Sequence, residues 1–169
     1  MAAPDGVRSG ARLVDNAEDG SSAPRKRTRG RELALQFLYL WDQRGPEVLD
    51  SLTQFVIQGD VDPSVQRFAR DLVRGVVDNL PGIDQKIIEV AENWDIHRMA
   101  VVDRNVLRLG TFELAYLTDI PPKVSINEAI DLAKKFSTAE SGAFVNGILD
   151  KIRKKHRDKQ PEPQPEPQP

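Results

Sequence analysis

Residues 103–152 read DRNVLRLGTFELAYLTDIPPKVSINEAIDLAKKFSTAESGAFVNGILDKI, and this stretch decides the fold. Apolar residues recur in it at every third or fourth position, which is the spacing of helices that bury one face. The pattern predicts three consecutive amphipathic helices, over about 99–117, 126–136 and 144–152.

Local signals suggest where these helices begin and end. Pro121 and Pro122 close the first one, because a residue that precedes proline is biased away from the helical conformation. Ser125 and Glu128 form an S-x-x-E capping box, in which each side chain can satisfy a free backbone N–H of the other. We therefore expect the second helix to start at Ser125.

The preceding part of the chain has the same helical period. It predicts helices over about 28–43, 47–58 and 82–92, and one that begins at Pro63 with Asp62 as its N-cap. Together with the three later helices, these give an all-α, compact bundle of about seven helices without a sheet.

Both ends of the chain differ in composition from the bundle. Residues 1–24 are rich in Gly, Ala, Ser and Asp without periodicity, and residues 160–169 read QPEPQPEPQP, a repeat that favours extended polyproline geometry. We expect a disordered leader over 1–24, one helical domain over 25–155 and a disordered Pro/Gln-rich tail over 156–169.

The composition argues against several classes of protein. The chain has no cysteine, and His97 and His156 are its only histidines, so a zinc site or histidine-based nucleophilic catalysis has little support. No apolar run approaches the roughly 20 residues that cross a bilayer, and no secretory signal is visible. We expect a cytoplasmic protein without a catalytic centre, cofactor, metal site or membrane segment.

Charge is distributed unevenly along the chain. The net charge of -2 divides into -2 for residues 1–24, +5 for 25–31, -8 for 32–150 and +3 for 151–169. This division suggests a polyanion as partner of the basic segments and a basic protein as partner of the acidic body. A solvated surface with charged ends is an equally good reading of the charge alone.

The basic run RKRTRGR, residues 25–31, directly precedes an apolar helical pattern. Clustered cations bind phosphates with release of counterions, and arginine can also stack on unpaired bases. The candidate RNA contacts are Arg25, Lys26, Arg27, Arg29 and Arg31. The alternative is a solvated arm, but positive charge opposes the helix dipole at this end, which favours the reading as an anion site.

Three aromatic residues could serve as stacking platforms for unpaired bases. For Tyr39 and Phe136 a place in the core is the better reading, because both fall on a helical apolar period. For Phe144, which follows the turn 137–143, the two readings are equally good.

Sequence blocks over about 27–153 are similar to the bacterial NusB family of transcription antitermination factors. They are R-x-V-L-R-L from Arg104, D-I-P-x-K-V-x-I-N-E-A-I-x-L-A-K-x-F from Asp119, and S-x-x-F-V-N-G-I-L-D-K-I from Ser141. An arginine-rich stretch that runs into R-E-x-A-x-Q-x-L-Y-x-W from Arg31 completes the resemblance.

The resemblance implies an all-α factor that binds boxA RNA together with NusE, a small-subunit ribosomal protein. Such a factor lets RNA polymerase read through terminators, notably in ribosomal RNA operons. The arginine-rich motif carries over to Arg27, Arg29 and Arg31. A second RNA-facing region matches Glu140, Ser141 and Phe144, and a NusE contact matches Asp103. Gly30 weakens the helix in this motif, so we expect the run to become ordered only on RNA.

Other readings stay open from the sequence. NusB-like domains also begin certain ribosomal RNA cytosine methyltransferases, but the methyl-donor domain that such an enzyme needs is absent from these residues. A helical protein-interaction module whose basic ends only aid solubility is a further alternative. Whether the chain is a monomer or a homodimer cannot be read from the sequence, and neither can its base preference.

Overall fold

The structure is a computed structural model and describes residues 19–158, with side chains from Arg25 onward. The disorder that we expected for 1–18 and 159–169 lies outside the described residues. Seven α-helices, and no strand, make up the described part. They are α2 (Asp19–Arg44), α3 (Leu52–Gln58), α4 (Pro63–Asp78), α5 (Leu80–Val90), α6 (Val101–Tyr116), α7 (Pro122–Phe136) and α8 (Ala139–Ile152). The predicted all-α fold is confirmed.

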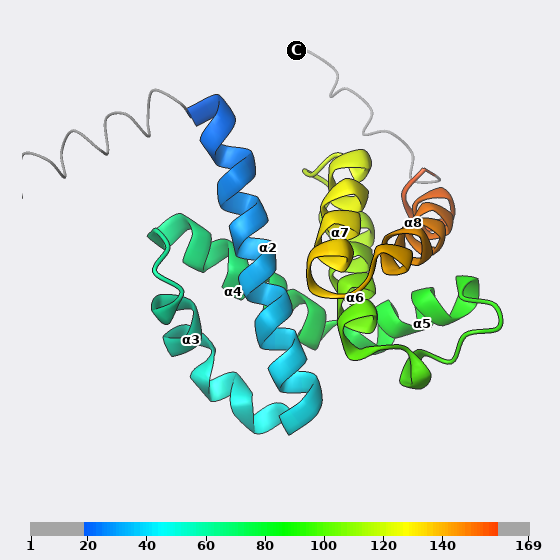
Figure 1. Cartoon of the computed structure of the whole chain (residues 1–169), viewed down its shortest axis with the longest axis horizontal. Helices are drawn as coiled ribbons and strands as arrows, with labels where there is room; N and C mark the ends of the chain where they lie inside the picture. The colour runs from blue at the N-terminus through cyan, green and yellow to red at the C-terminus, as the bar shows by residue number, and fades with distance from the viewer. Residues whose placement is uncertain (1–18, 159–169) are drawn as a thin grey trace, which may run out of the picture.

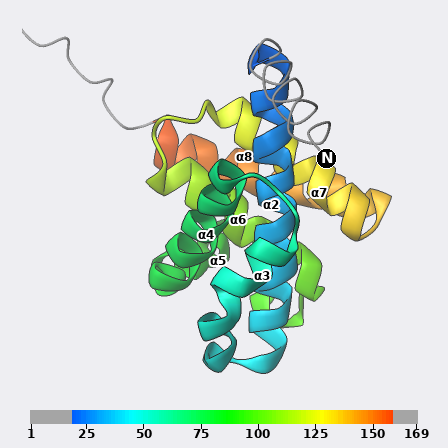
Figure 2. The ribbon, with the colours of Figure 1, turned by 90° about the vertical axis from the view of Figure 1, so that its left-hand side faces the viewer.

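Three shorter helical segments join or extend these helices. They are the 3-10 helices η1 (Pro46–Ser51) and η2 (Ile96–Arg98), and a π-helix η3 (Arg153–Arg157). Figure 1 shows α3 on one side of α2, α4 crossing behind α2, and α5 to α8 on the other side. Figure 2, turned by a quarter, shows α2 running almost the full height of the molecule.

Helix α6 is the centre of the core, because every one of its residues from 104 to 114 is buried. It packs against α2, α4, α5, α7 and α8. Gly75 of α4 lets α6 approach closely, since a Cβ atom there would collide with the ring of Phe112. The helix is therefore buried on all sides and holds the two halves of the bundle together.

Two buried arginines of α6 pair with half-buried carboxylates. Asp42, near the end of α2, accepts hydrogen bonds from Arg104 at 2.6 and 2.9 Å, from Arg108 at 3.0 Å and from Asn105 at 2.9 Å. Arg108 also binds both carboxylate oxygens of Asp84 on α5, at 2.9 and 3.0 Å. Because each charge has partners of opposite sign, the network can be buried between three helices.

The start of α4 agrees with the sequence, whereas those of α2, α7 and α8 differ, since α8 begins at Ala139 and not near 144. Asp62 caps α4 as predicted, since its Oδ1 atom accepts from the backbone N–H groups of Ser64 and Val65 at 3.1 and 3.2 Å. Helix α2 begins at Asp19 and not near 28, so it overlaps the last residues of the leader that we expected over 1–24. The predicted capping box is also wrong: α7 begins at Pro122, and Ser125 lies inside it.

The end of the domain also lies later than predicted. Residues 156–158, expected in the disordered tail, continue the helical chain through η3. The guanidinium group of Arg157 donates to four backbone carbonyl oxygens, those of Leu114, Leu117, Thr118 and Ile120, at 2.9 to 3.2 Å. Arg157 thus ties η3 to carbonyls in the last turn of α6 and in the segment that follows it.

Candidate nucleic-acid interface

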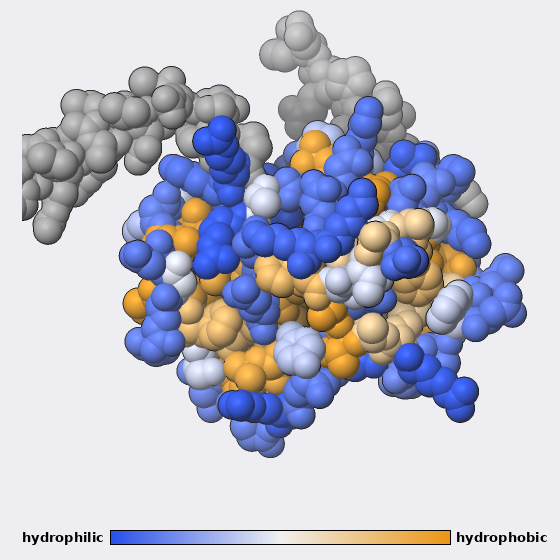
Figure 3. Space-filling model, in the orientation of Figure 1, coloured by the Kyte–Doolittle hydropathy of each residue, from blue (hydrophilic) through white to orange (hydrophobic). Residues whose placement is uncertain are grey.

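Four cations line the first turns of α2 and stay accessible. We call Arg25, Lys26, Arg27 and Arg29 the arginine head; Arg25 and Arg27 are exposed, while Lys26 and Arg29 are half-buried. In Figure 3 the surface over this end of α2 is among the most hydrophilic in the view. The run is continuous helix, so the expectation that it becomes ordered only on RNA is wrong for this structure.

The members of the arginine head differ in how far their charge is compensated. Arg29 pairs with Glu32 at 3.2 Å and Lys26 with Asp62 at 3.2 Å. Among the described residues, no carboxylate forms an ion pair with Arg25 or Arg27. These two arginines keep the largest uncompensated charge for an anion.

Arg31 does not belong to this exposed surface, although the sequence placed it among the RNA contacts. Its side chain is 2% exposed and forms two hydrogen bonds with Glu113 of α6, at 2.6 and 2.9 Å. Glu128 of α7 lies 3.8 Å away. Because both faces of the guanidinium group are inside the protein, Arg31 fixes α2 against α6 and cannot reach a phosphate without unpacking.

Helix α7 holds the arginine head from the other side. Glu128 accepts a hydrogen bond from Thr28 at 2.8 Å, and Lys135 pairs with Glu32 at 2.9 Å. The hydroxyl of Ser125, which we had assigned to a capping box, donates to Glu113 at 3.0 Å. These contacts position the cationic turns of α2 relative to α7.

The turn after α7 forms a second candidate surface. Thr138 caps α8 by accepting from the backbone N–H of Ser141 at 3.2 Å. The hydroxyl of Ser141, a buried residue, donates to Asp103 of α6 at 3.1 Å. The structure therefore brings Asp103, predicted to contact a protein, next to a residue that was predicted to contact RNA.

A cavity of about 420 Å³ opens beside Ser141 and Asp103. Its lining includes Asp103, Glu140, Ser141, Phe144 and Trp94. Trp94 is 59% exposed and meets Phe144 edge-to-face, with 5.0 Å between the ring centroids. Phe144 is half-buried and lies at this surface. Because both rings are partly exposed, the pair can stack on a planar group.

Trp94 was not predicted from the sequence. The aromatic candidates Tyr39 and Phe136 do not line this cavity. Tyr39 is 46% exposed on α2, so its predicted place in the core is wrong. Phe136 packs against the core as predicted, with the ammonium of Lys135 at 5.5 Å from its ring centroid. The signal available in the sequence for Trp94 was a tryptophan between the helices predicted over 82–92 and 99–117.

Comparison with known proteins identifies the family. The NusB family model matches residues 28–154. The transcription antitermination protein NusB of Anaeromyxobacter dehalogenans is 50% identical over 128 residues, which cover 75% of this chain and 89% of the relative. That of Citrifermentans bemidjiense is 48% identical over 134 residues, 75% and 92% of the two chains. The chain belongs to the NusB family.

Solved NusB structures have the same fold. The NusB of T. maritima is 41% identical, with a TM-score of 0.68 over 77% of this chain and 92% of that one. A crystal structure of the antitermination factors NusB and NusE in complex with double-stranded RNA is 32% identical, with a TM-score of 0.71 over 78% and 98%. The family consists of RNA-binding antitermination factors and not of enzymes.

The NusB fold leaves no long apolar helix in the described part. None of the helices there has the length and hydropathy needed to cross a membrane. No group of three or more histidine, cysteine or acidic side chains that could hold a metal ion occurs among the described residues.

Proposed function

We propose that this chain is a cytoplasmic antitermination factor that binds boxA RNA together with NusE and supports read-through by RNA polymerase, notably in ribosomal RNA operons. The observation that carries the proposal is the arginine head, where Arg25 and Arg27 have no carboxylate partner among the described residues. Membership of the NusB family, and the complex of a related NusB with NusE and RNA, support the same role.

The RNA contacts in this proposal are Arg25, Lys26, Arg27 and Arg29 on α2, together with Glu140, Ser141 and Phe144 beyond α7. Ser141 is buried and bonded to Asp103, so we assign it the role of holding the turn, while Phe144 offers its ring. Arg31 is removed from the contacts and becomes a positioning residue. Asp103 remains the proposed NusE contact, and its acidic charge suits a basic ribosomal protein.

The experiment is a titration of boxA-like and scrambled single-stranded RNA at several salt concentrations, with and without NusE. We expect log affinity to fall by about 0.7 per phosphate contact for each decade of salt, so by about 3 if all four cations engage. NusE should raise the preference for boxA, and Asp103→Asn should weaken that gain. A double-stranded RNA of the same sequence should compete less well than the single strand.

A triple variant separates the arginine head from general basicity. Arg25→Ala, Arg27→Ala and Arg29→Ala together should lower RNA affinity at least tenfold and reduce the salt slope by about 2. The matched control removes three cations elsewhere, by Arg44→Ala, Arg74→Ala and Lys154→Ala, and should change affinity little. If both triples lose the same affinity, RNA binding follows net charge and the solubility module becomes the better reading. A homodimer that covers the arginine head would appear in sedimentation as dissociation on addition of RNA.

A further inference from the structure

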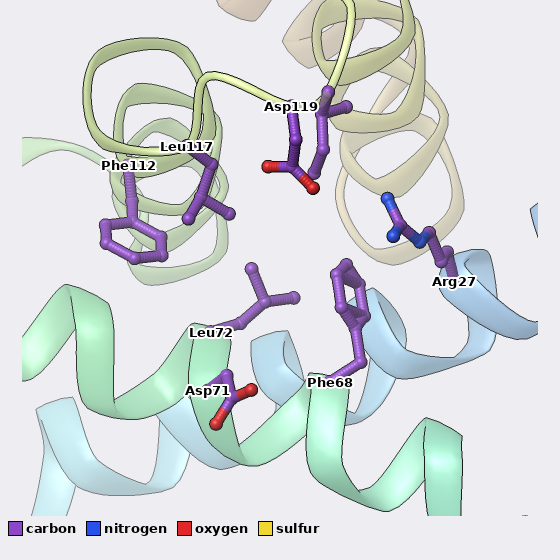
Figure 4. A pocket seen from close by; sticks show the side chains of 8 residues that line it. Arg27, Phe68, Asp71, Leu72, Phe112, Leu117 and Asp119 are labelled. Atoms are coloured by element: carbon purple, nitrogen blue, oxygen red, sulfur yellow. The ribbon is translucent and has the colours of Figure 1, made fainter.

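A second, smaller cavity lies beside the arginine head. It has a volume of about 230 Å³ and lies between α2, α4 and the segment that follows α6. Phe68 and Leu72 of α4 and Phe112 of α6 form apolar walls, and Arg27 stands at the edge. Figure 4 shows the Arg27 guanidinium and the Asp119 carboxylate facing each other across the opening.

The size of the cavity limits what it can hold. Pockets for drug-sized ligands begin at roughly 300 Å³, so this one suits a single ring system and not a whole nucleotide. The guanidinium carbon of Arg27 lies 5.2 Å from the centroid of the Phe68 ring. Unpaired RNA bases stack both on aromatic rings and on arginine planes, so this pair is a platform for a base.

The polar groups at the cavity select for a hydrogen-bond donor. Asp71 and Asp119 are exposed carboxylates on its lining, and neither forms an ion pair with a described residue. Carboxylates accept hydrogen bonds from the exocyclic amino groups of bases, whereas they repel phosphate. The backbone of an RNA would therefore stay on the cations, and only a base would enter.

We infer that this cavity binds one unstacked base with an exocyclic amino group from the RNA that the arginine head holds. The inference rests on the proposed function. A lysine or arginine side chain of a protein partner would also suit two carboxylates. However, Arg27 at the edge repels an incoming cation and attracts the phosphate that flanks a base, which favours RNA.

Cytidine and uridine offer a minimal test, because they differ at this edge in an amino group against a carbonyl oxygen. A short single-stranded RNA is changed from cytidine to uridine one position at a time, and each version is titrated against the full chain. At one position the wild type should prefer cytidine by about tenfold, the order of a good base contact. Asp119→Asn or Asp71→Asn should reduce that preference to less than about threefold, and Phe68→Leu should weaken both RNAs.

The control is Asp78→Asn, which changes an exposed carboxylate at the far end of α4 and should leave the preference intact. If no position discriminates cytidine from uridine, or if both aspartate variants discriminate as well as the wild type, the inference is overturned while the arginine-dependent salt slope stands. A wild type that binds no RNA would overturn the proposed function as well. Competition by a basic peptide that disappears in Asp119→Asn would assign the cavity to a protein side chain instead.

Discussion

Two groups of arginines in this chain have opposite surroundings. Arg104 and Arg108 on α6 are buried and share the carboxylate of Asp42, and Arg108 also pairs with Asp84. Arg25 and Arg27 on α2 are exposed, and no described carboxylate pairs with them. An arginine that pairs with a carboxylate of another helix therefore stabilises the packing of the two helices. An exposed arginine without such a carboxylate is available to bind a polyanion.

The basic run 25–31 contains arginines of both kinds, since Arg31 is buried and paired while Arg25 and Arg27 are exposed. In the sequence Arg31 is one of five cations in seven residues, yet its side chain pairs with Glu113 as the α6 arginines pair with Asp42. The run changes role within two residues, because Arg31 lies buried against α6, whereas Arg29 stays partly exposed.

The largest expected effect comes from breaking the Arg31 pair. Arg31→Ala leaves Glu113 buried and charged, so we expect the free energy of unfolding to fall by about 3–5 kcal/mol. Denaturation in urea, followed by circular dichroism, measures it. Arg25→Ala, from the exposed group, is the matched control and should stay within about 0.5 kcal/mol.

A double variant separates the loss of the Arg31–Glu113 ion pair from the loss of side-chain packing. Arg31→Met with Glu113→Met should be more stable than Arg31→Ala, because no buried charge is then left alone. Equal stability losses for Arg31→Ala and Arg25→Ala would contradict the division of the run into two roles.

A smaller effect is expected from the acidic partner of the α6 arginines. Burial alone would raise the pKa of Asp42, but hydrogen bonds from Arg104 and Asn105 and the charges of Arg104 and Arg108 outweigh it and hold the pKa below its ordinary value of 3.8. A lowered pKa in the folded state stabilises the fold above the ordinary value, and this stabilisation is lost as the pH falls through the folded pKa.

We therefore expect unfolding free energies measured in urea to drop below about pH 4, with Asp42 contributing part of that drop. Asp42→Asn should lower stability at neutral pH and flatten the acid side of the profile. Asp50→Asn, an exposed carboxylate on η1, should change neither. An acid profile of Asp42→Asn parallel to the wild type would show that Asp42 is not held as the contacts indicate.

Much of the fold could be predicted from the sequence, because helical periodicity and local caps are properties of neighbouring residues. Asp62 caps α4 within three residues of itself and was predicted correctly. Ser125 and Glu128 have the capping pattern but are used by α6 and α2 instead, since Ser125 donates to Glu113 and Glu128 accepts from Thr28. Only the packing of helices distant in the sequence decides between these uses.

The candidate site divides in the same way. The basic run was visible as composition. Its free and its paired members differ through Glu32, three residues from Arg29, and through Glu113, Glu128 and Asp62, which lie far along the chain. The bond between Ser141 and Asp103 spans 38 positions, so no local pattern could reveal it. RNA contacts that are predicted from motif positions are therefore only candidates. The burial of each side chain in the structure decides which of them can reach RNA.

The smallest expected effect concerns Lys26, which is intermediate between the two groups. It pairs with Asp62 at 3.2 Å while both side chains stay about 40% exposed (39% and 42%). Such pairs contribute little, so Lys26→Ala should change stability by less than about 0.5 kcal/mol. It should also weaken RNA binding less than Arg25→Ala does, because Asp62 already compensates part of its charge.

Asp62→Ser tests this compensation from the other side. Serine can still cap α4, so the helix should remain stable while the carboxylate is gone. RNA affinity should then rise by a few-fold and the salt slope should steepen, since Lys26 becomes free for phosphate. In the Lys26→Ala background the same change should raise affinity less. A gain of equal size in both backgrounds would mean that Asp62 acts on RNA by general repulsion and not by holding Lys26.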